Sequence, residues 1–98
     1  MRRYALDIAA QKDLRAIYKH VRQDSAAAAQ RLRELFLQKF RFLAQHPEAG
    51  ESREDLARDL RLFTAGNFAI LFRAIQDGVA IARVIHGARD LETIVRGR

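Results

Sequence analysis

Two apolar runs on either side of a tight turn limit what this chain can fold into. Residues 68–75 and 79–86 are rich in β-branched, aromatic and other apolar side chains, and Gln76-Asp77-Gly78 separates them. Asp77-Gly78 is a strong hairpin signal, because both positions of a two-residue hairpin turn need residues that tolerate positive φ. Residues 60–63 form another candidate strand, followed by turn-forming residues at 64–67. The last third of the chain is therefore predicted to be three antiparallel strands.

The first half of the chain has the apolar spacing of helices. After a short candidate strand at residues 3–7, apolar side chains recur three or four positions apart through residues 9–21 and 26–43. Asp7 and Asp24 are candidates for capping the two helices, and Pro47 ends the second, since proline cannot continue the helical hydrogen bonding. One strand, a helical hairpin and three antiparallel strands predict a single α+β domain over residues 1–98.

Strand parity predicts which side chains share a face of the sheet. With a two-residue Asp77-Gly78 turn, the first face carries Phe68, Ile70, Phe72, Ala74, Val79, Ile81, Arg83 and Ile85. The second face carries the smaller set Ala69, Leu71, Arg73, Ile75, Ala80, Ala82, Val84 and His86. The bulkier first face should receive the helical hairpin. Because the second face is also largely apolar, we expect another molecule to cover it. Parity sends Arg83 toward the helices, and the sequence leaves open whether a bulge turns it over.

The charge of the chain restricts its partners without choosing among them. The 18 Lys and Arg residues exceed the 12 Asp and Glu residues, which gives a net charge of +6, and 15 of the 18 are arginine. Arginine pairs in a bidentate manner with carboxylates and phosphates. The excess is compatible with a nucleic acid, an acidic protein partner or a plain solvated surface.

Several classes of protein and site are excluded or not expected. The absence of cysteine excludes a disulfide framework and a cysteine-based zinc site, and it is compatible with a reducing cytoplasm. No apolar run is long enough to span a membrane, and the first residues do not have the pattern of a secretory signal. The three histidines are too scattered to suggest a metal site, so no metal or cofactor is expected.

The candidate site residues gather where the last strand ends, in Arg83-Val84-Ile85-His86-Gly87-Ala88-Arg89-Asp90. A cluster of this kind at a sheet edge can hold a phosphate, an acidic peptide or a catalytic centre. By parity, Arg73 and His86 share the second face and are candidates for contact with a partner. They can equally bond to each other or to local carbonyls, and Arg89 and Asp90 can form a local salt bridge.

These segments resemble a known family in their order and spacing. The segments that carry the resemblance are residues 13–18, 27–35, 42–50, 60–61, 72–73, 77–79 and 83–90, the last of which contains His86-Gly87-Ala88-Arg89-Asp90. Together they resemble the ParE branch of the RelE/ParE toxins, the toxic halves of bacterial type II toxin–antitoxin modules. The resemblance implies a fold with a helical hairpin on a sheet, and a ParD-like antitoxin encoded by the adjacent gene. The C-terminal helical and extended segment of such an antitoxin wraps its toxin.

The resemblance also implies one of two targets. ParE-type toxins trap DNA gyrase on cleaved DNA, whereas RelE-type relatives cut messenger RNA on the ribosome, and the shared fold does not choose between them. Metal-free RNA cleavage needs a base, an acid and cations around the phosphorane. RelE-like toxins have four basic positions, which align here with Arg61, Phe63, Ala69 and Arg89. Two of the four are apolar, which favours the gyrase inhibitor over a ribonuclease using His86, Arg61 and Arg89.

The resulting hypothesis is a non-enzymatic, cytoplasmic toxin that inhibits gyrase and forms a hetero-oligomer with its antitoxin. It involves neither a membrane nor direct sequence-specific DNA binding. The antitoxin is expected to be acidic where it binds, and to cover the second sheet face and the groove beside the helical hairpin. A ribosome-dependent messenger-RNA endoribonuclease and a non-toxic remnant that still binds antitoxin are the alternatives. The residues predicted to bind a partner are Arg61, Leu71, Arg73, Val84, His86 and Arg89.

Overall fold

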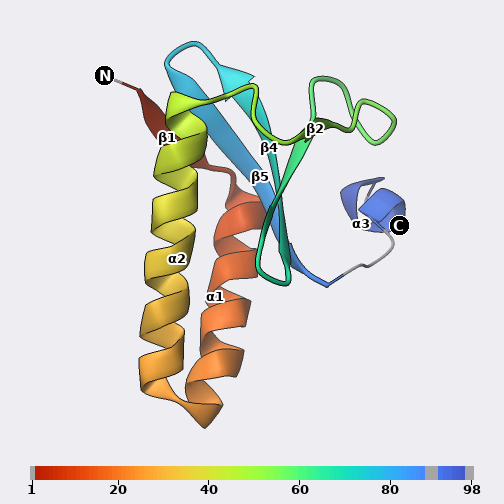
Figure 1. The fold of residues 1–98 in the computed structure, drawn as a ribbon. Helices are drawn as coiled ribbons and strands as arrows, with labels where there is room; N and C mark the ends of the chain where they lie inside the picture. The colour runs from red at the N-terminus through yellow and green to blue at the C-terminus, as the bar shows by residue number, and fades with distance from the viewer. Residues whose placement is uncertain (1, 88–90, 97–98) are drawn as a thin grey trace.

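The computed structural model describes residues 2–87 and 91–96, and it contains the predicted strand, two helices and three strands in that order, with a two-residue strand and a short C-terminal helix that were not predicted (Figure 1). In chain order they are β1 (Arg3–Leu6), α1 (Ile8–Asp24), α2 (Ala26–Gln45), β2 (Glu51–Ser52), β3 (Arg61–Ala65), β4 (Phe68–Ile75), β5 (Gly78–His86) and α3 (Leu91–Arg96). No helix in the described ranges has both the length and the apolar character that a membrane crossing requires. The predicted α+β class is confirmed.

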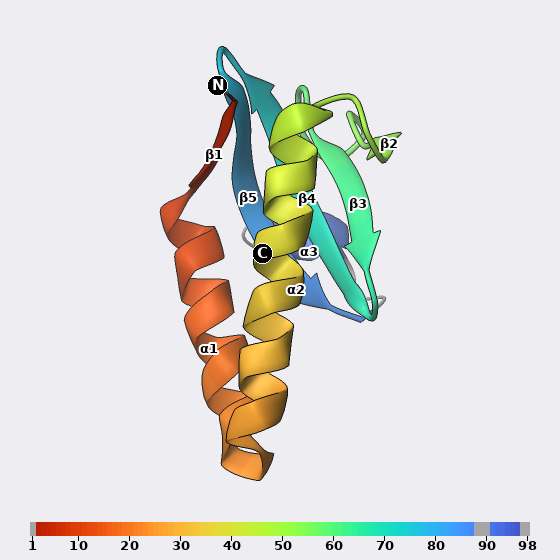
Figure 2. The ribbon, with the colours of Figure 1, turned by 60° about the vertical axis from the view of Figure 1, so that its left-hand side comes forward.

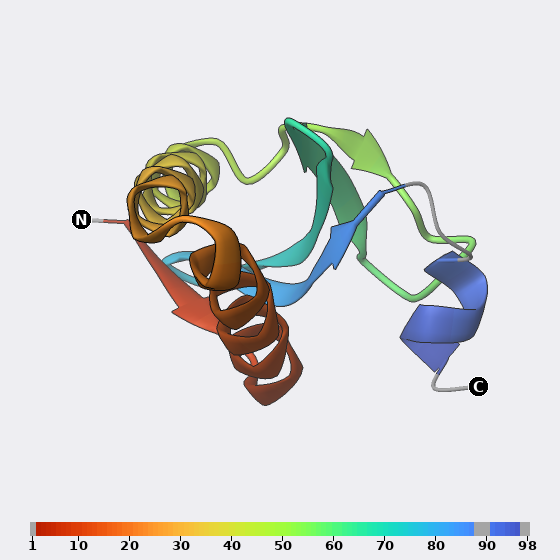
Figure 3. The ribbon, with the colours of Figure 1, turned by 90° about the horizontal axis from the view of Figure 1, so that it is seen from below.

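The sheet contains two strands more than the predicted three-stranded unit. Its strand order is β1-β5-β4-β3-β2, with β1 parallel to β5 and the other neighbours antiparallel. The α1–α2 hairpin lies along one side of this sheet and α3 lies on the other side (Figures 2 and 3). The short β1 is therefore an edge strand that the two long helices connect to the rest of the sheet.

The two helices present apolar side chains to the sheet at helical spacing. In α1 the buried residues are Ala10, Leu14 and Tyr18, and in α2 they are Ala29, Phe36, Phe40, Leu43 and Ala44. Ser25, and not Asp24, caps α2, because its hydroxyl oxygen accepts a hydrogen bond from the Ala28 amide at 3.0 Å. Asp7 stands at the N-cap position of α1 but makes no side-chain cap bond.

The core lies between the helical hairpin and the first sheet face. Phe36 stacks on Phe40 with ring centroids 6.0 Å apart and meets Phe68 of β4 edge-on at 5.0 Å. Phe72 and Ile81 complete the sheet side of this core and are fully buried. Full burial of a large apolar side chain contributes about 1.5–3 kcal/mol, so these contacts supply much of the attachment of the hairpin to the sheet.

A β-bulge in β5 changes the predicted faces. The strands turn at Gln76-Asp77, since Ile75 pairs with Gly78, and the register shifts between Leu71 and Phe72 of β4. Ala82 is the extra residue, and beyond it every side chain of β5 faces the opposite way. Val84 and His86 consequently lie on the helix-facing side, whereas Arg83 and Ile85 lie on the second face. Their predicted positions were wrong, and the open question about Arg83 is answered by the bulge.

The second face is covered by this chain itself, so the expectation that another molecule covers it was wrong. Leu71 and Ile85 form a small buried cluster with Leu56 and Leu60, which come from the segment between β2 and β3. Leu91, Ile94 and Val95 of α3 pack against the same cluster. Strand parity considers only the strands. The residues that cover this face come from the segment between β2 and β3 and from α3, and neither has a clear hydrophobic periodicity.

Candidate functional site

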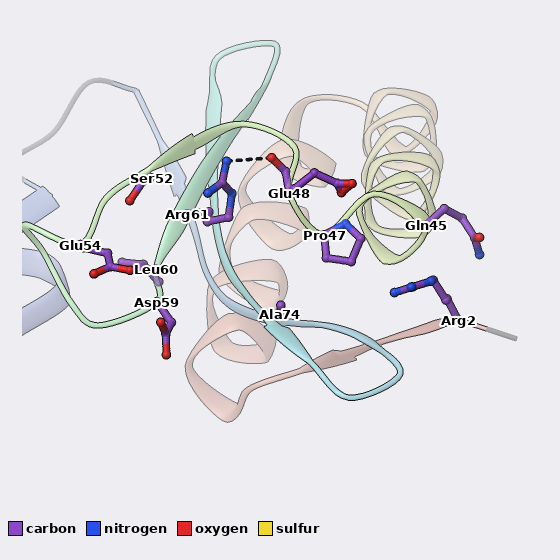
Figure 4. A pocket seen from close by; sticks show the side chains of 10 residues that line it. All are labelled: Arg2, Gln45, Pro47, Glu48, Ser52, Glu54, Asp59, Leu60, Arg61 and Ala74. Atoms are coloured by element: carbon purple, nitrogen blue, oxygen red, sulfur yellow. Dashed lines mark hydrogen bonds between the residues drawn. The ribbon is translucent and has the colours of Figure 1, made fainter.

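Arg61, at the start of β3, is an internal clamp. Its guanidinium donates a hydrogen bond to the carbonyl oxygen of Glu48 at 2.7 Å (Figure 4). It also donates to the carbonyl oxygens of Ala49 at 3.0 Å and Gly50 at 3.1 Å. These carbonyls follow the end of α2, so Arg61 fixes the chain as it leaves the helical hairpin and enters the sheet. Arg61 also lines a pocket of about 650 Å³, whose wall contains Glu48, Glu54 and Asp59.

Replacing Arg61 with alanine should lower the free energy of unfolding by about 1.5–2 kcal/mol, because three carbonyl oxygens lose a charged donor. Urea denaturation followed by circular dichroism would measure the loss. Arg58→Ala is the matched control, since the Arg58 side chain is 93% exposed and only approaches Asp59 at 3.9 Å. Equal stability of the two variants would contradict the clamp.

Arg73 is held in an ion pair that ties β4 to the segment joining β1 to α1. Its Nη1 donates to Asp7 Oδ2 at 2.8 Å and its Nη2 to Asp7 Oδ1 at 3.4 Å. The hydrogen bond to Asp7 raises the pKa of the Arg73 guanidinium above its ordinary value. Arg73 is opposite Ala80, which in turn is opposite Ala5, so its side chain crosses small residues to reach Asp7. This pairing explains why Asp7 does not cap α1.

Two residues of the predicted partner-binding set are inaccessible. Leu71 is fully buried in the cluster beneath α3, and Val84 is buried in the main core after the bulge turns it over. A partner cannot contact either side chain without displacing part of this chain, so their assignment as contact residues was wrong. Both were assigned from a strand parity that did not include the bulge or α3.

His86 is exposed at the end of β5, and its ring lies tilted by 42° against the ring of Phe68 with centroids 4.8 Å apart. It lines a shallow pocket with Thr64, Asn67 and Gly87, at the end of the sheet where β3 finishes and β4 begins. Arg61 of β3 pairs with Phe72 and His86 of β5 pairs with Phe68, so the two residues flank β4 on opposite sides and are offset along it by four positions, roughly 13 Å.

The structure therefore does not bring His86 and Arg61 together as a ribonuclease centre would require. Arg89, the third member of that set, lies outside the described residues, as does Asp90. Among the described residues, no group of three or more metal-ligating side chains could hold a metal ion. The sequence cluster that ends the last strand thus supplies one exposed side chain, His86, to the described surface.

Asp13 and Arg83 form a polar centre that the sequence did not indicate. Arg83 Nε and Nη2 donate to the two carboxylate oxygens of Asp13 at 2.8 and 2.9 Å, and the Val84 amide donates to Asp13 Oδ2 at 2.9 Å. This hydrogen bonding raises the pKa of Arg83. The strand β1 ends opposite Ile81, while β5 continues to His86. Asp13 therefore accepts a backbone hydrogen bond at the part of the β5 edge that β1 does not cover. Because the bulge puts the Arg83 side chain on the second face, Arg83 reaches Asp13 around the edge of β5, and its Nη1 also donates to the Ile94 carbonyl oxygen of α3 at 3.4 Å.

A groove lies on the helix side of β1, and we call it the β1 groove. It consists of two pockets of about 290 and 450 Å³ that share Tyr4. The lining residues of the first are Tyr4, Leu6, Gln11, Leu14, Arg15, Tyr18, Arg33, Leu37 and Phe40, and those of the second are Arg2, Arg3, Tyr4, Arg41, Ala44 and Gln45. Sequence reasoning missed this groove, although the basic residues spaced along both helices were a signal for it.

Electrostatics keep the β1 groove positive. The Arg33 guanidinium carbon lies 4.2 Å above the centre of the Tyr18 ring, a cation–π contact. Burial raises the pKa of the Tyr18 phenol, so this hydroxyl stays neutral at physiological pH and adds no negative charge. The groove has an apolar floor and an arginine rim, which suits a ligand that carries both apolar groups and carboxylates.

The chain is similar to known proteins in both sequence and structure. Residues 4–91 match the family described as the ParE toxin of the type II toxin–antitoxin system, parDE. A solved structure of the chromosomal ParDE TA system from P. aeruginosa has a TM-score of 0.73 and 23% sequence identity, over 90% of this chain and 98% of that chain. At this identity the likeness concerns the fold. No curated protein matches the chain.

Proposed function

The chain belongs to the ParE toxin family of type II toxin–antitoxin systems, and from that membership we propose that it is a cytoplasmic toxin that inhibits DNA gyrase. A ParD-like antitoxin, encoded by the adjacent gene, neutralises it by forming a hetero-oligomer. The observation that carries the proposal is the family match over residues 4–91. The toxin acts by binding, and not as an enzyme.

The arrangement of the candidate residues supports inhibition by binding over RNA cleavage. His86 is four positions of β4 away from Arg61, and Arg61 donates to three backbone carbonyls of its own chain. A phosphorane would need these two side chains together, with further cations. His86 remains a contact residue in the proposal, because it is exposed beside Phe68 at a sheet end that a protein target can reach.

Supercoiling by purified gyrase is the test of the proposal. Added protein should reduce supercoiling and make cleaved DNA accumulate, and the antitoxin should abolish both effects. His86→Ala should still inhibit to within about fivefold, because loss of one exposed contact at an interface costs at most about 1 kcal/mol outside the hot spots. Primer extension on translated messages should reveal no cuts positioned by codons.

Three results would contradict the proposal. Unchanged supercoiling with no cleaved DNA would remove gyrase as the target. Codon-positioned cuts that disappear in His86→Ala would favour the ribonuclease. Tight antitoxin binding by a protein that does not slow growth would indicate a non-toxic remnant that still binds its antitoxin.

A further inference from the structure

Four cations form a row along the outer face of α1, and we call this row the α1 stripe. It consists of Lys12, Arg15, Lys19 and Arg22, and all four side chains are exposed. Because an α-helix has 3.6 residues per turn and rises 1.5 Å per residue, steps of three, four and three keep the row on one face over about 15 Å. None of the four has an ion-pair partner among the described residues. Arg15 also borders the β1 groove, whereas the other three line no part of it.

The carboxylates of α1 leave this charge uncompensated. Asp13 accepts from Arg83 and from the Val84 amide, and Asp24 lies roughly 160° around the helix from the middle of the α1 stripe. Residues 8–45 carry eight Lys and Arg against three Asp and Glu, whereas the rest of the chain carries ten against nine. The helical hairpin therefore holds most of the net charge of +6, and its outer surface attracts anions.

The α1 stripe is accessible to a long partner. The turn between α1 and α2 lies beyond the end of the sheet, so the hairpin projects from the body of the molecule (Figures 1 and 2). A partner that lies along α1 can consequently contact the whole row without meeting the sheet.

The surface around the α1 stripe lacks the side chains that other partners need. Its exposed neighbours are Gln11, Ala16, His20 and Gln23, and the one exposed large apolar residue of α1 is Ile8, at the beginning of the helix. A specific protein interface has an apolar core, and a helix at a membrane surface buries an apolar face in the lipid. Binding of single-stranded nucleic acid uses aromatic rings on which bases stack, and α1 exposes no Phe, Tyr or Trp. A polar row of cations instead fits a regular array of phosphates.

We propose that the α1 stripe binds the phosphate backbone of duplex DNA without reading its sequence. Contacts between cations and phosphates supply this kind of binding, and they contain no information about the bases. DNA is favoured over double-stranded RNA, because the major groove of B-DNA admits an α-helix and that of RNA is too narrow. The inference goes beyond the proposed function, since it assigns a second partner and does not depend on gyrase being the target.

Binding of the full chain to a short fluorescent DNA duplex, followed by anisotropy, tests the inference. The logarithm of the binding constant should fall linearly with the logarithm of the salt concentration, with a slope of about −3 to −4 for four phosphate contacts. This slope corresponds to a loss of about a hundredfold between 50 and 200 mM salt. A duplex of unrelated sequence should bind within about twofold.

Two matched variants locate the binding surface. Lys19→Gln, Arg22→Gln removes two cations of the α1 stripe, and Lys39→Gln, Arg58→Gln removes one lysine and one arginine outside α1. At 50 mM salt, the stripe variant should bind DNA at least about tenfold more weakly, with a slope reduced to about −2, and the control should bind within about threefold. Equal melting temperatures of the two variants would verify that both are folded.

The outcomes separate this inference from the proposed function, because the assay contains no gyrase. Equal weakening in the two variants, or no binding of the unaltered protein at 50 mM salt, would overturn the α1 stripe as a DNA site and leave gyrase inhibition as it stands. Tighter binding to an RNA duplex of the same sequence would overturn DNA as the partner. Polyglutamate that competes as well as unlabelled DNA at equal charge would show that the stripe selects an acidic protein.

Discussion

Replacing Gly78 with alanine is expected to lower the free energy of unfolding by at least about 3 kcal/mol and to detach β1 from the sheet. Gly78 has φ +150°, and a Cβ there would overlap the Arg3 carbonyl oxygen and lie 2.8 Å from the Arg3 carbonyl carbon. Both obstacles are backbone atoms, so no side-chain rotation relieves them. The strand β1 must move away from β5, which loses the packing of Tyr4 and Leu6 on the core. Urea denaturation would measure the loss, and exchange of the β1 amides would show the detachment.

Gly66→Ala is the control for backbone strain without steric overlap. Gly66 also has positive φ, at +58°, but an added Cβ would meet nothing within 4 Å. Its cost should be limited to about 1–2 kcal/mol for the left-handed conformation. The two variants together separate conformational strain from close approach of β1. A Gly78→Ala protein with the stability of Gly66→Ala, and with unchanged exchange in β1, would show that β1 does not depend on this contact.

The Gly78 position illustrates what sequence could and could not predict here. Asp77-Gly78 correctly predicted a hairpin, yet the turn itself is Gln76-Asp77 and Gly78 is the first residue of β5. Glycine is needed there because a parallel strand from the other end of the chain passes close to it. Local turn propensities contain no information about a neighbour that is more than seventy residues away in sequence. The hairpin was therefore predicted correctly, but the role given to Gly78 in its turn was wrong.

The helices and the core were predictable because their patterns are local. Apolar residues spaced three and four apart include Leu14, Tyr18, Phe36, Phe40 and Leu43, and all five are buried. The candidate site was predicted less well, since it depended on parity continuing through β5. One extra residue, Ala82, reverses the second half of that strand. Nothing in a run of small and β-branched residues marks which of them will be left unpaired.

The cover over the second sheet face was missed for a related reason. Leu56 and Leu60 stand in a mainly polar segment, and α3 is only six residues long, so neither has a periodic pattern of useful length. An apolar second face was nevertheless a correct observation. The wrong step was to assign this face to a partner. An apolar face implies a partner only when the chain's own short segments do not cover it.

Removing the Asp13 carboxylate should cost about 2–3 kcal/mol in unfolding free energy, which corresponds to a fall in melting temperature of roughly 10–20 °C. Asp13→Ala leaves Arg83 without its bidentate partner and leaves the Val84 amide at the edge of β5 without an acceptor. The Asp13 and Arg83 side chains are 15% and 29% exposed, so the loss should fall short of the about 3–5 kcal/mol expected for a fully buried pair. Thermal unfolding followed by circular dichroism would measure it.

Two further substitutions decide which part of this centre matters. Asp13→Asn keeps an acceptor for the Val84 amide but removes the charge, so it should cost about half as much as Asp13→Ala if the amide and the guanidinium contribute comparably. Asp24→Ala, at an exposed position at the end of the same helix, should change stability by less than about 0.5 kcal/mol. Equal melting temperatures for Asp13→Ala and Asp24→Ala would mean that α1 is attached to β5 by apolar contacts alone. A full loss in Asp13→Asn would instead place the whole effect in the ion pair with Arg83.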